Sequence, residues 1–364
     1  MLFTIIIFIV VLAVLVLVHE LGHFIVAKKS GMIVEEFGFG FPPRLFSFKK
    51  DATRYSFNLF PVGGFVKIEG EDGEVSSDQR SFVNKPVWQR ALTLIAGAGM
   101  NFFLAIVFFS LVAGLGFPEE VTKENQAAAS DQKIIVLAAV EGSPANLAGL
   151  RAGDQILKFA GEDITSIDQL QTLTRLKSGQ ETNLLFKRQT EIVAVSIIAR
   201  LSPPAEQGPL GIALANVATI KYSFFAVIGQ GFSRSFQTAW LIISALAELL
   251  KNLITQGRLT QELAGPIGVA VFSGQVARLG LAALLNFTAL LSVNLAVLNL
   301  LPIPALDGGR LLFLLIEKVR GRRGQKIEQL SNMIGFSLLI TLMILVSIKD
   351  LIKFEIIDRI KIIF

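Results

Sequence analysis

The sequence contains no cysteine and only two histidines among its 364 residues. The absence of cysteine excludes disulfide bonds and thiolate metal sites. A transition metal would therefore need histidine, carboxylate or amide ligands. Charged residues are also scarce, at 17% of the chain, whereas hydrophobic residues make up 52%. Together with a mean hydropathy of +0.60, these values exclude an ordinary soluble domain and predict a membrane protein.

The formal net charge of +5 does not indicate a nucleic-acid partner. Basic residues lie largely beside apolar runs, where they are typical of cytoplasmic flanks of membrane spans. We therefore expect the lipid bilayer, and no nucleic acid, as a partner. The first seventeen residues have neither a basic start nor a cleavage site for a signal peptide, so this segment is predicted to remain as a transmembrane helix.

Four segments are long and apolar enough to cross a bilayer. They are residues 2–27, 91–117, 281–300 and, somewhat short, 333–348. Basic residues follow the first segment, precede the second and fill the loop before the fourth, whereas the start of the chain carries none. Because basic loops stay in the cytoplasm, both of these loops are predicted to be cytoplasmic and both termini to lie outside. The basic tail after Ile348 argues weakly against this orientation.

A further apolar stretch, residues 224–254, is ambiguous. Arg234, Glu248 and Lys251 interrupt it, which favours an amphipathic helix at the membrane interface. Topology supports this interpretation, because a fifth span would place the inner ends of the first and third spans on opposite sides. From the sequence, whether residues 235–250 span the membrane stays open.

Between the first two spans, the run RYSFNLFPVGGFVKIEG alternates polar residues with Tyr55, Phe57 and Leu59. A period of two is typical of a half-buried strand. The earlier run FGFGFPPRLFSFKKDA has a similar pattern and ends at a polar turn. We predict sheet-forming hairpins against the membrane, which either cover the helix ends as a lid or offer an edge to a substrate.

A soluble unit of about residues 132–216 separates the second and third spans. The run KIIVLAAV is a predicted strand, and Ser143 before Pro144 predicts the start of a short helix. Ser166 with Gln169 three residues later predicts a second, capped helix. With the strand patterns QILKFAGEDI, TNLLFKR and IVAVSIIA, the predicted order is strand, helix, strand, helix, strand, strand.

Both histidines lie in one apolar run, LVLVHELGHFIV. Residues four apart share a helix face, so His19 and His23 can bind one metal ion, with Glu20 beside it. This is the arrangement of zinc hydrolases, in which the histidines are ligands and the glutamate is the general base. A charged group inside a membrane helix costs about 2.5 to 3.5 kcal/mol, which metal binding can offset. The alternative is that these polar residues only cap the inner end of the helix.

A catalytic zinc site usually has three protein ligands and one open position. Because the chain has no third histidine and no cysteine, the third ligand must be a carboxylate, and Asp307 in NLLPIPALDGGR is the candidate. Aspartate before glycine is also a common turn pair, so Asp307 could be only a cap. Its predicted depth and side of the membrane match those of the histidines, near the cytoplasmic face, which favours the ligand.

The motif HELGH at residues 19–23 and the later residues Asn299, Pro302, Pro304 and LDG at 306–308 together resemble the site-2 protease family. Within it, they resemble the bacterial regulator-of-sigma-E (RseP-type) intramembrane zinc metalloproteases, over nearly the whole chain. The resemblance implies that Zn²⁺ is the cofactor. It assigns the metal ligands to His19, His23 and Asp307 and the activation of water to Glu20.

The resemblance also implies roles away from the metal. Asn294 and Asn299 match positions that hold the unwound substrate, since an amide can bond to a backbone that has lost its helical hydrogen bonds. Their alternative role is hydrogen bonding between helices. The soluble unit resembles a PDZ domain, whose loop residues Leu210, Gly211 and Ile212 would receive a peptide terminus by strand addition. Alternatively, this domain is a spacer that limits access by size.

Two features depart from the family pattern. The chain carries one PDZ unit where the best-known enterobacterial relatives carry two, which leaves the filtering of substrates open. Ala98 in AGAGMNFFLA stands where the family commonly has proline. This change puts the expected kink of the second span in doubt, and it leaves the metal site unaffected.

The expected fold is an α-helical membrane protein with four transmembrane helices, membrane-associated β-hairpins and one inserted α+β PDZ domain. The predicted regions are 1–118 with the first two spans, 122–216 as the PDZ domain, 217–280 with the interfacial amphipathic helix, and 281–364 with the last two spans.

The expected function is that of an intramembrane zinc metalloprotease in regulated intramembrane proteolysis. Its substrates would be single-span membrane proteins of the anti-sigma-factor type, or remnant signal peptides, after an upstream site-1 protease has shortened their outer domain. The expected location is the bacterial cytoplasmic membrane, with the PDZ domain on the extracytoplasmic side. The competing interpretations are a catalytically inactive membrane PDZ scaffold, against which the complete ligand set argues, and a metal transporter, which would need a second polar station in the spans.

Overall fold

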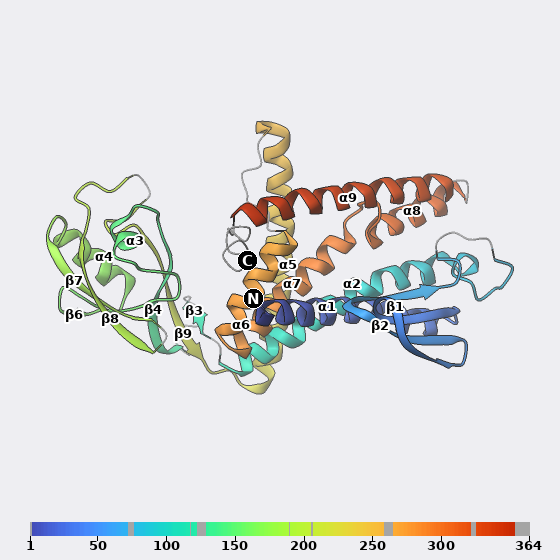
Figure 1. Cartoon of the computed structure of the whole chain (residues 1–364), viewed down its shortest axis with the longest axis horizontal. Helices are drawn as coiled ribbons and strands as arrows, with labels where there is room; N and C mark the ends of the chain where they lie inside the picture. Colours follow the sequence, from blue (N-terminus) through green and yellow to red (C-terminus); the bar gives the residue numbers. More distant parts are fainter. Residues whose placement is uncertain are drawn as a thin grey trace, which may run out of the picture. The chain divides into compact units, whose positions relative to one another are not determined.

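The structure, a computed structural model, describes residues 2–71, 76–116, 118–121, 129–188, 190–204, 207–257, 265–321 and 325–353 (Figure 1). It divides into two compact units. The membrane unit comprises Met1–Val112 and Phe224–Phe364, and the inserted unit comprises Ala113–Ser223. Arg322 and Arg323 of the predicted cytoplasmic loop, and the predicted start of the PDZ domain at 122–128, lie outside the described residues.

The membrane unit consists mainly of helices. They are α1 (Leu2–Lys29), α2 (Val87–Gly114), α5 (Phe224–Gln256), α6 (Pro266–Arg278), α7 (Leu281–Leu300), α8 (Asp307–Arg320) and α9 (Gln325–Lys353), with a short 3₁₀ helix, η1, at Phe82–Asn84. Within the described part of the chain, α1, α2, α5, α7 and α9 are long and apolar enough to cross a bilayer. The prediction of a membrane protein with several apolar helices is therefore confirmed.

The four predicted spans lie on α1, α2, α7 and α9, although α2 ends at Gly114, short of the predicted end. Helices α1 and α7, which carry the first and third predicted spans, run in the same direction. Thr4 at the start of α1 contacts Gly274 on α6, directly before α7, while the far ends of α1 and α7 meet at the metal site described below. Helix α9 runs in the opposite direction to α7. Asn332 near the start of α9 bonds to Ala305, which follows α7, and Asp350 near the end of α9 bonds to Gly268 on α6.

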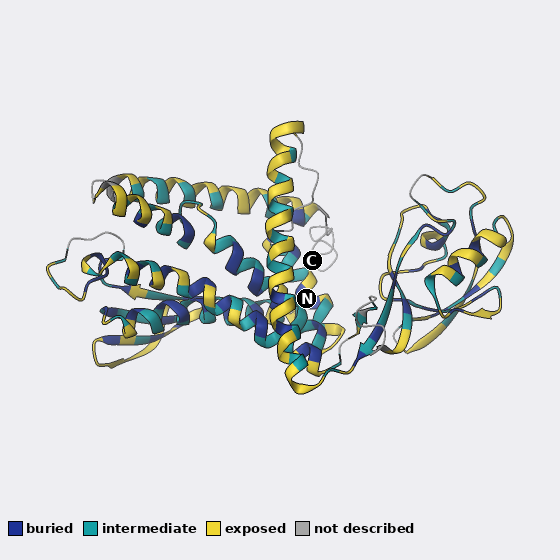
Figure 2. Ribbon diagram, turned by 180° about the vertical axis from the view of Figure 1, so that it is seen from behind, coloured by how far each residue is buried: buried dark blue, intermediate teal, exposed yellow. Residues whose placement is uncertain are grey.

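Helix α5 meets the criteria of length and composition for a span, but its direction differs from that of the other long helices. Figure 1 shows α5 running across α1 and α9. Its surface is largely exposed along its length, as Figure 2 shows, with Gly231 and Ser235 as its buried residues. The number of membrane crossings is thus not fixed by length and composition alone.

Small residues allow the helices of this unit to approach closely. A methyl group on Gly22 of α1 would overlap the carbonyl oxygen of Ala96 on α2, and one on Gly231 of α5 would overlap Ser110 on α2. Helices in lipid gain from such close packing, because no hydrophobic effect draws them together there. The contact of α1 with α2 brings the backbone of α2 up to the histidine face of α1.

The predicted hairpins form one sheet from two long strands, β1 (Val34–Lys50) and β2 (Thr53–Ile68), joined by the predicted polar turn. Each strand bends back on its partner, so that Phe37 lies opposite Val66 on one side and opposite Tyr55 on the other. The bends coincide with proline and glycine in FGFPPR and FPVGGF, which interrupt the ladder.

The alternation predicted in β2 is present, but the buried face is the polar one. Ser56 and Asn58 are buried, whereas Phe57 and Leu59 are 40% and 48% exposed. The Asn58 amide donates to the carbonyl oxygen of Gly40, so its polar group is satisfied inside the sheet. An outward apolar face is what contact with hydrocarbon requires, since lipid reverses the usual preference for polar residues at a surface.

In its described residues, the inserted unit contains a seven-stranded sheet and two helices. Its elements are β3 (Glu119–Glu120), β4 (Ala129–Ala139), α3 (Pro144–Leu147), β5 (Gln155–Phe159), β6 (Glu162–Asp163), α4 (Ile167–Leu176), β7 (Glu181–Arg188), β8 (Glu191–Ile198) and β9 (Ile212–Ile220). The strand order is β3-β9-β4-β5-β7-β8, with β6 pairing β5. The predicted succession of strands and helices is present, with β3 and β6 in addition, and β9 begins at Ile212 of the predicted peptide-binding loop.

Both predicted helix starts are present in this unit, and a serine side chain caps each of them. The Ser143 hydroxyl accepts from the backbone N–H of Asn146 at 3.2 Å, and the Ser166 hydroxyl accepts from that of Gln169 at 3.1 Å. Each cap satisfies a helix N–H that has no partner within the helix. The sequence therefore sets the first residue of α3 and of α4.

Phe159 lies at the centre of the core of the inserted unit and has no exposed surface. Replacing it with alanine should destabilise this unit by about 3 to 5 kcal/mol, because the substitution leaves a cavity. Hydrogen exchange of the purified full-length chain should then show faster exchange in β5 and β7. Leu147→Ala is the control, since Leu147 is 79% exposed. Equal protection of β5 and β7 in the Phe159 variant and the wild type would contradict the assigned core.

Candidate metal centre

Two buried imidazoles project from one face of α1. His19 and His23 lie one helical turn apart, and their side chains are 10% and 8% exposed. Their Nε2 atoms are 3.2 Å apart. Because α1 is continuous from Leu2 to Lys29, the spacing of the two rings is set by the helix itself.

Asp307 reaches the histidines from the first residue of α8. Helix α7 ends at Leu300, and Pro302 and Pro304 prevent its continuation. Side chains on Gly308 and Gly309 would overlap the backbone of Leu301 and Ile303. The close backbone approach predicted for these glycines is therefore made within the turn from α7 to α8, and it directs Asp307 toward α1.

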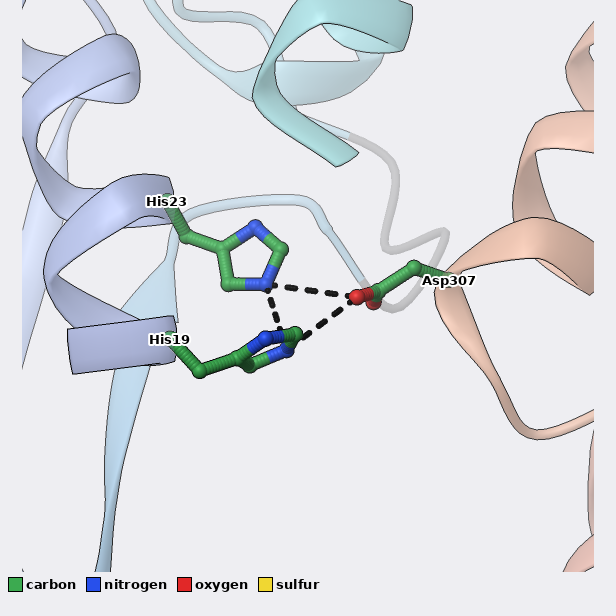
Figure 3. A group of neighbouring side chains, drawn as sticks. All are labelled: His19, His23 and Asp307. Carbon is green, nitrogen blue, oxygen red and sulfur yellow. Dashed lines mark hydrogen bonds and ion pairs between the residues drawn. The ribbon is translucent and has the colours of Figure 1, made fainter. Parts of the chain in front are cut away.

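The three predicted ligands converge, as Figure 3 shows. Asp307 Oδ2 lies 3.2 Å from His19 Nε2 and 3.4 Å from His23 Nε2. Ligand atoms at the corners of a tetrahedron, each about 2.0 to 2.1 Å from the metal, lie about 3.3 to 3.4 Å apart. Apart from these two ion pairs, the buried Asp307 Oδ2 has no hydrogen-bond partner among the described residues. Two imidazoles and a carboxylate oxygen that face one another in this way fit a zinc site with an open fourth position.

Hydrogen bonds on the far side of each ring orient the histidines. His23 Nδ1 donates to the carbonyl oxygen of Thr93 on α2 at 2.8 Å, which leaves Nε2 without a proton and able to bind a metal. The amide of Asn101, also on α2, lies 3.4 Å from His19 Nδ1. With an amide flip, Asn101 Oδ1, which otherwise has no partner among the described residues, accepts the Nδ1 proton.

Glu20 lies next to this cluster and is held by the hairpin sheet. Its Oε2 accepts a hydrogen bond from the backbone N–H of Val66 on β2 at 3.0 Å. Glu20 and the three candidate ligands line one cavity of about 240 Å³. The predicted base and the predicted ligands thus line the same cavity, and residues of β2 line it as well.

Asn299 belongs to the same site, whereas Asn294 does not contact it. The Asn299 amide nitrogen lies 3.4 Å from His19 Nε2. Asn294 lies five residues before Asn299 on α7 and is half-buried. Of the two predicted substrate-binding asparagines, only Asn299 lies where it can contact the reacting groups.

The predicted peptide-binding loop lies beside a groove of the inserted unit. Leu210, Gly211 and Ile212 line a cavity of about 400 Å³ together with residues of α4 such as Ile167 and Leu170. Gly211 has a φ of +68°, and a side chain there would lie 2.5 Å from Ser143 Cβ. Only glycine fits this position without strain.

Gly97 on α2 is a residue of the site that the sequence analysis did not identify. A methyl group there would overlap His23 Nε2 and lie 2.7 Å from His19 Cε1. The site therefore needs a residue without a side chain at the point where α2 crosses the two rings. The signal was the small-residue run AGAG, which also fits ordinary helix packing in a membrane.

Comparison with known proteins identifies the family. The model of "Peptidase family M50" matches residues 7–342, which is most of the chain. The chain belongs to Peptidase family M50. As an M50 protein with several apolar helices, it is a zinc metalloprotease and a multi-pass membrane protein that acts by intramembrane proteolysis, which confirms the predicted enzyme class and cofactor.

Three relatives match over nearly their full lengths. A protein from Clostridium perfringens is 38% identical over 341 residues, 93% of this chain and 95% of that protein, and its name includes the term zinc metalloprotease. Zinc metalloprotease RasP of Geobacillus kaustophilus is 30% identical, covering 96% of this chain and 98% of that protein. Regulator of sigma-W protease RasP of Bacillus subtilis is 28% identical with the same coverage.

Among solved structures, the match is local. The PDZ domain of the SdrC-like protein Lmo2051 from Listeria monocytogenes is 20% identical, with a TM-score of 0.21, and the match covers 26% of this chain and 93% of that one. The PDZ domain of the SdrC-like protein Lin2157 from Listeria innocua is 25% identical, with a TM-score of 0.20, covering 22% and 92%.

The Gly97→Ala variant tests the packing of α2 on the metal centre. Because the added methyl group meets both imidazoles, we expect zinc affinity to fall about 10- to 100-fold, the usual effect of disturbing the groups around metal ligands. Zinc affinity is measured on purified protein by competition with a chelator. Gly99→Ala is a matched control two residues away, since nothing lies within 4 Å of a methyl group there. Equal zinc affinity of the two variants would refute the proposed contact.

Proposed function

We propose that this M50 metalloprotease cuts single-span membrane proteins of the anti-sigma-factor type, or remnant signal peptides, inside the bilayer. The observation that carries the proposal is the convergence of two helix-borne imidazoles, a carboxylate and Glu20 in one cavity of a strongly apolar helix bundle. A relative is named Regulator of sigma-W protease, which supports substrates that control a sigma factor.

In this proposal, His19, His23 and Asp307 hold the zinc ion, which supplies a Lewis acid for the scissile carbonyl and activates water when bound. Glu20 is the general base. The N–H of Val66 fixes one of its carboxylate oxygens, so the other is available to take a proton from the attacking water and pass it to the leaving amine. The apolar surroundings limit the access of bulk water, which strengthens each electrostatic interaction in the site.

The substrate must be partly unwound before it is cut, because the carbonyls of an intact helix are shielded by their own hydrogen bonds. Asn299 is placed to bond to an unwound backbone, since its amide lies 3.4 Å from His19 Nε2. Asn294, five residues before Asn299 on α7, would contact a part of the substrate farther from the metal. The hairpin strand that holds Glu20 borders the same cavity and can align an extended segment there.

The inserted unit acts in this proposal as a PDZ domain, occupying the predicted region 122–216. Its groove beside Leu210, Gly211 and Ile212 would receive a peptide terminus. A bulky outer domain cannot pass this unit and the hairpins, so an upstream site-1 protease must shorten the substrate first. The size of the remaining outer segment would then decide which proteins are cut.

We further propose that the chain lies in the bacterial cytoplasmic membrane with four spans, α1, α2, α7 and α9. Helix α5 would lie at the interface, within the predicted region 217–280, as its direction across the other long helices favours (Figure 1). The basic residues Lys28 and Lys29 after α1 favour a cytoplasmic position for the end that carries the metal centre. The PDZ domain would then be extracytoplasmic.

Replacing Glu20 with glutamine tests the general base. The amide keeps the size of the side chain but cannot take a proton, so cleavage of a model transmembrane substrate in detergent should fall about 100- to 10,000-fold. Bound zinc, measured by elemental analysis of the same preparation, should stay at the wild-type level. Turnover close to that of the wild type would remove Glu20 from the mechanism.

Replacing Asp307 with alanine tests the third ligand. We expect the purified protein to lose its zinc and its activity together, because two histidines alone hold the ion weakly. Asp163→Ala is the control, since the Asp163 side chain is 75% exposed and lies in the inserted unit. An Asp307→Ala variant that keeps a full complement of zinc would show that another residue completes the site.

A further inference from the structure

One face of α8 carries a regular series of residues. Asp307, Arg310, Leu314 and Glu317 follow one another at intervals of three, four and three residues, which places them along a single helix face. This face lies against α2 and the segment that follows β2, as the contacts of each residue show. The position of Asp307 therefore depends on the contacts of the other three residues on this face.

Arg310, one turn after Asp307, binds Glu71 through two groups. Its Nη1 donates to Glu71 Oε1 at 2.6 Å, and its Nη2 donates to the backbone carbonyl oxygen of Glu71 at 2.9 Å. The side chains of Arg310 and Glu71 are 22% and 16% exposed, so solvent screens the pair only partly. Two bonds from one guanidinium to one residue fix direction as well as distance.

Glu71 in turn belongs to the chain segment that holds the general base. It lies three residues after the end of β2, whose Val66 N–H binds Glu20, and its own N–H donates to the carbonyl oxygen of Ile68 at 3.1 Å. Two residues earlier, the Glu69 N–H donates to the carbonyl oxygen of Ile33 at 3.0 Å. The pair therefore links the helix that carries Asp307 to the strand that carries the partner of Glu20.

The far end of the same α8 face is held in a comparable way. Glu317 accepts from Arg90 of α2 at 2.9 Å, and Leu314 between the two pairs is 4% exposed and packs in the core that includes Leu94 and Ile68. The end of α8 near the metal differs in one respect. Arg310 and Glu71 line two cavities, that of the metal centre and a neighbouring one of about 230 Å³. Leu314 and Arg90 line only the second of these cavities, so the first turn of α8 has open space on two sides and its side-chain pairs matter more for its position.

The geometry points to Arg310 and Glu71 as positioning residues that hold Asp307 in register with His19 and His23. This inference rests on the proposed role of Asp307 as a zinc ligand. Neither residue needs to touch the metal or the substrate. Their pair fixes the first turn of α8 against the hairpin segment, and thereby fixes the carboxylate 3.2 Å from one imidazole and 3.4 Å from the other. Loosening the pair should weaken the binding of zinc before it affects the folded state.

The test compares zinc affinity in Arg310→Gln, Glu71→Gln and the double variant, using the full-length chain in detergent and competition with a chelator. Positioning predicts that both single variants bind Zn²⁺ about 10- to 100-fold more weakly. If the two residues acted only through their charges, zinc affinity would change in opposite directions. Removing the Arg310 cation would strengthen the binding of Zn²⁺, and removing the Glu71 anion would weaken it. The double variant should be no weaker than the weaker single variant, since both changes break the same link.

Controls separate this inference from loss of folding and from failure of the proposed function. Arg80→Gln breaks the exposed pair of Arg80 with Asp78 and should leave zinc affinity unchanged. Thermal unfolding of all variants in the presence of chelator should match that of the metal-free wild type. If Asp307→Ala keeps its zinc, the ligand assignment fails and this inference with it. If Asp307→Ala loses zinc but Arg310→Gln binds it as tightly as the wild type, or the losses in the double variant add, only the positioning role is overturned.

Discussion

The contact of the Asp307 carboxylate with two imidazoles of α1 is the constraint on which the membrane unit depends. It requires the ends of α1 and α7 to meet on one side, so these helices run in the same direction and α2 and α9 return. Carboxylate and imidazole groups are costly in an apolar bundle unless each one has a partner. Thr93 and Asn101 supply partners for the two imidazoles, and the imidazoles in turn are the ion-pair partners of the Asp307 carboxylate.

Glycine residues, which have no side chain, matter as much to this site as the polar groups. Gly97 leaves room for both rings on α2, Gly22 lets α1 approach α2, and the glycines after Asp307 let α8 begin against the preceding turn. In lipid, close packing of small residues is the main source of helix association. The same contacts that hold the bundle together therefore also set the distances within the metal centre.

The sequence predicted those parts of the fold and site that depend on local rules. The HELGH spacing placed two imidazoles on one face, serine residues marked the starts of α3 and α4, and the need for a carboxylate, together with the matching of membrane sides, singled out Asp307. The features that it did not predict need long-range information. The double pairing of Phe37, the buried polar face at Ser56 and Asn58, and the link from Arg310 to Glu71 depend on which segments meet in space. For α5, length and composition favour a membrane span, whereas its charged residues favour a position at the interface, so the sequence alone does not assign it.

The ends of the inserted unit are neighbours. Its first strand, β3, pairs with its last, β9, with Glu119 opposite Ala218, and the Tyr222 hydroxyl donates to Glu119 at 2.9 Å. A folded module whose entry and exit lie side by side can be added at a single point of a host protein without separating the host segments on either side. A change in the size of this unit can therefore leave the separation of the flanking helices α2 and α5 unchanged.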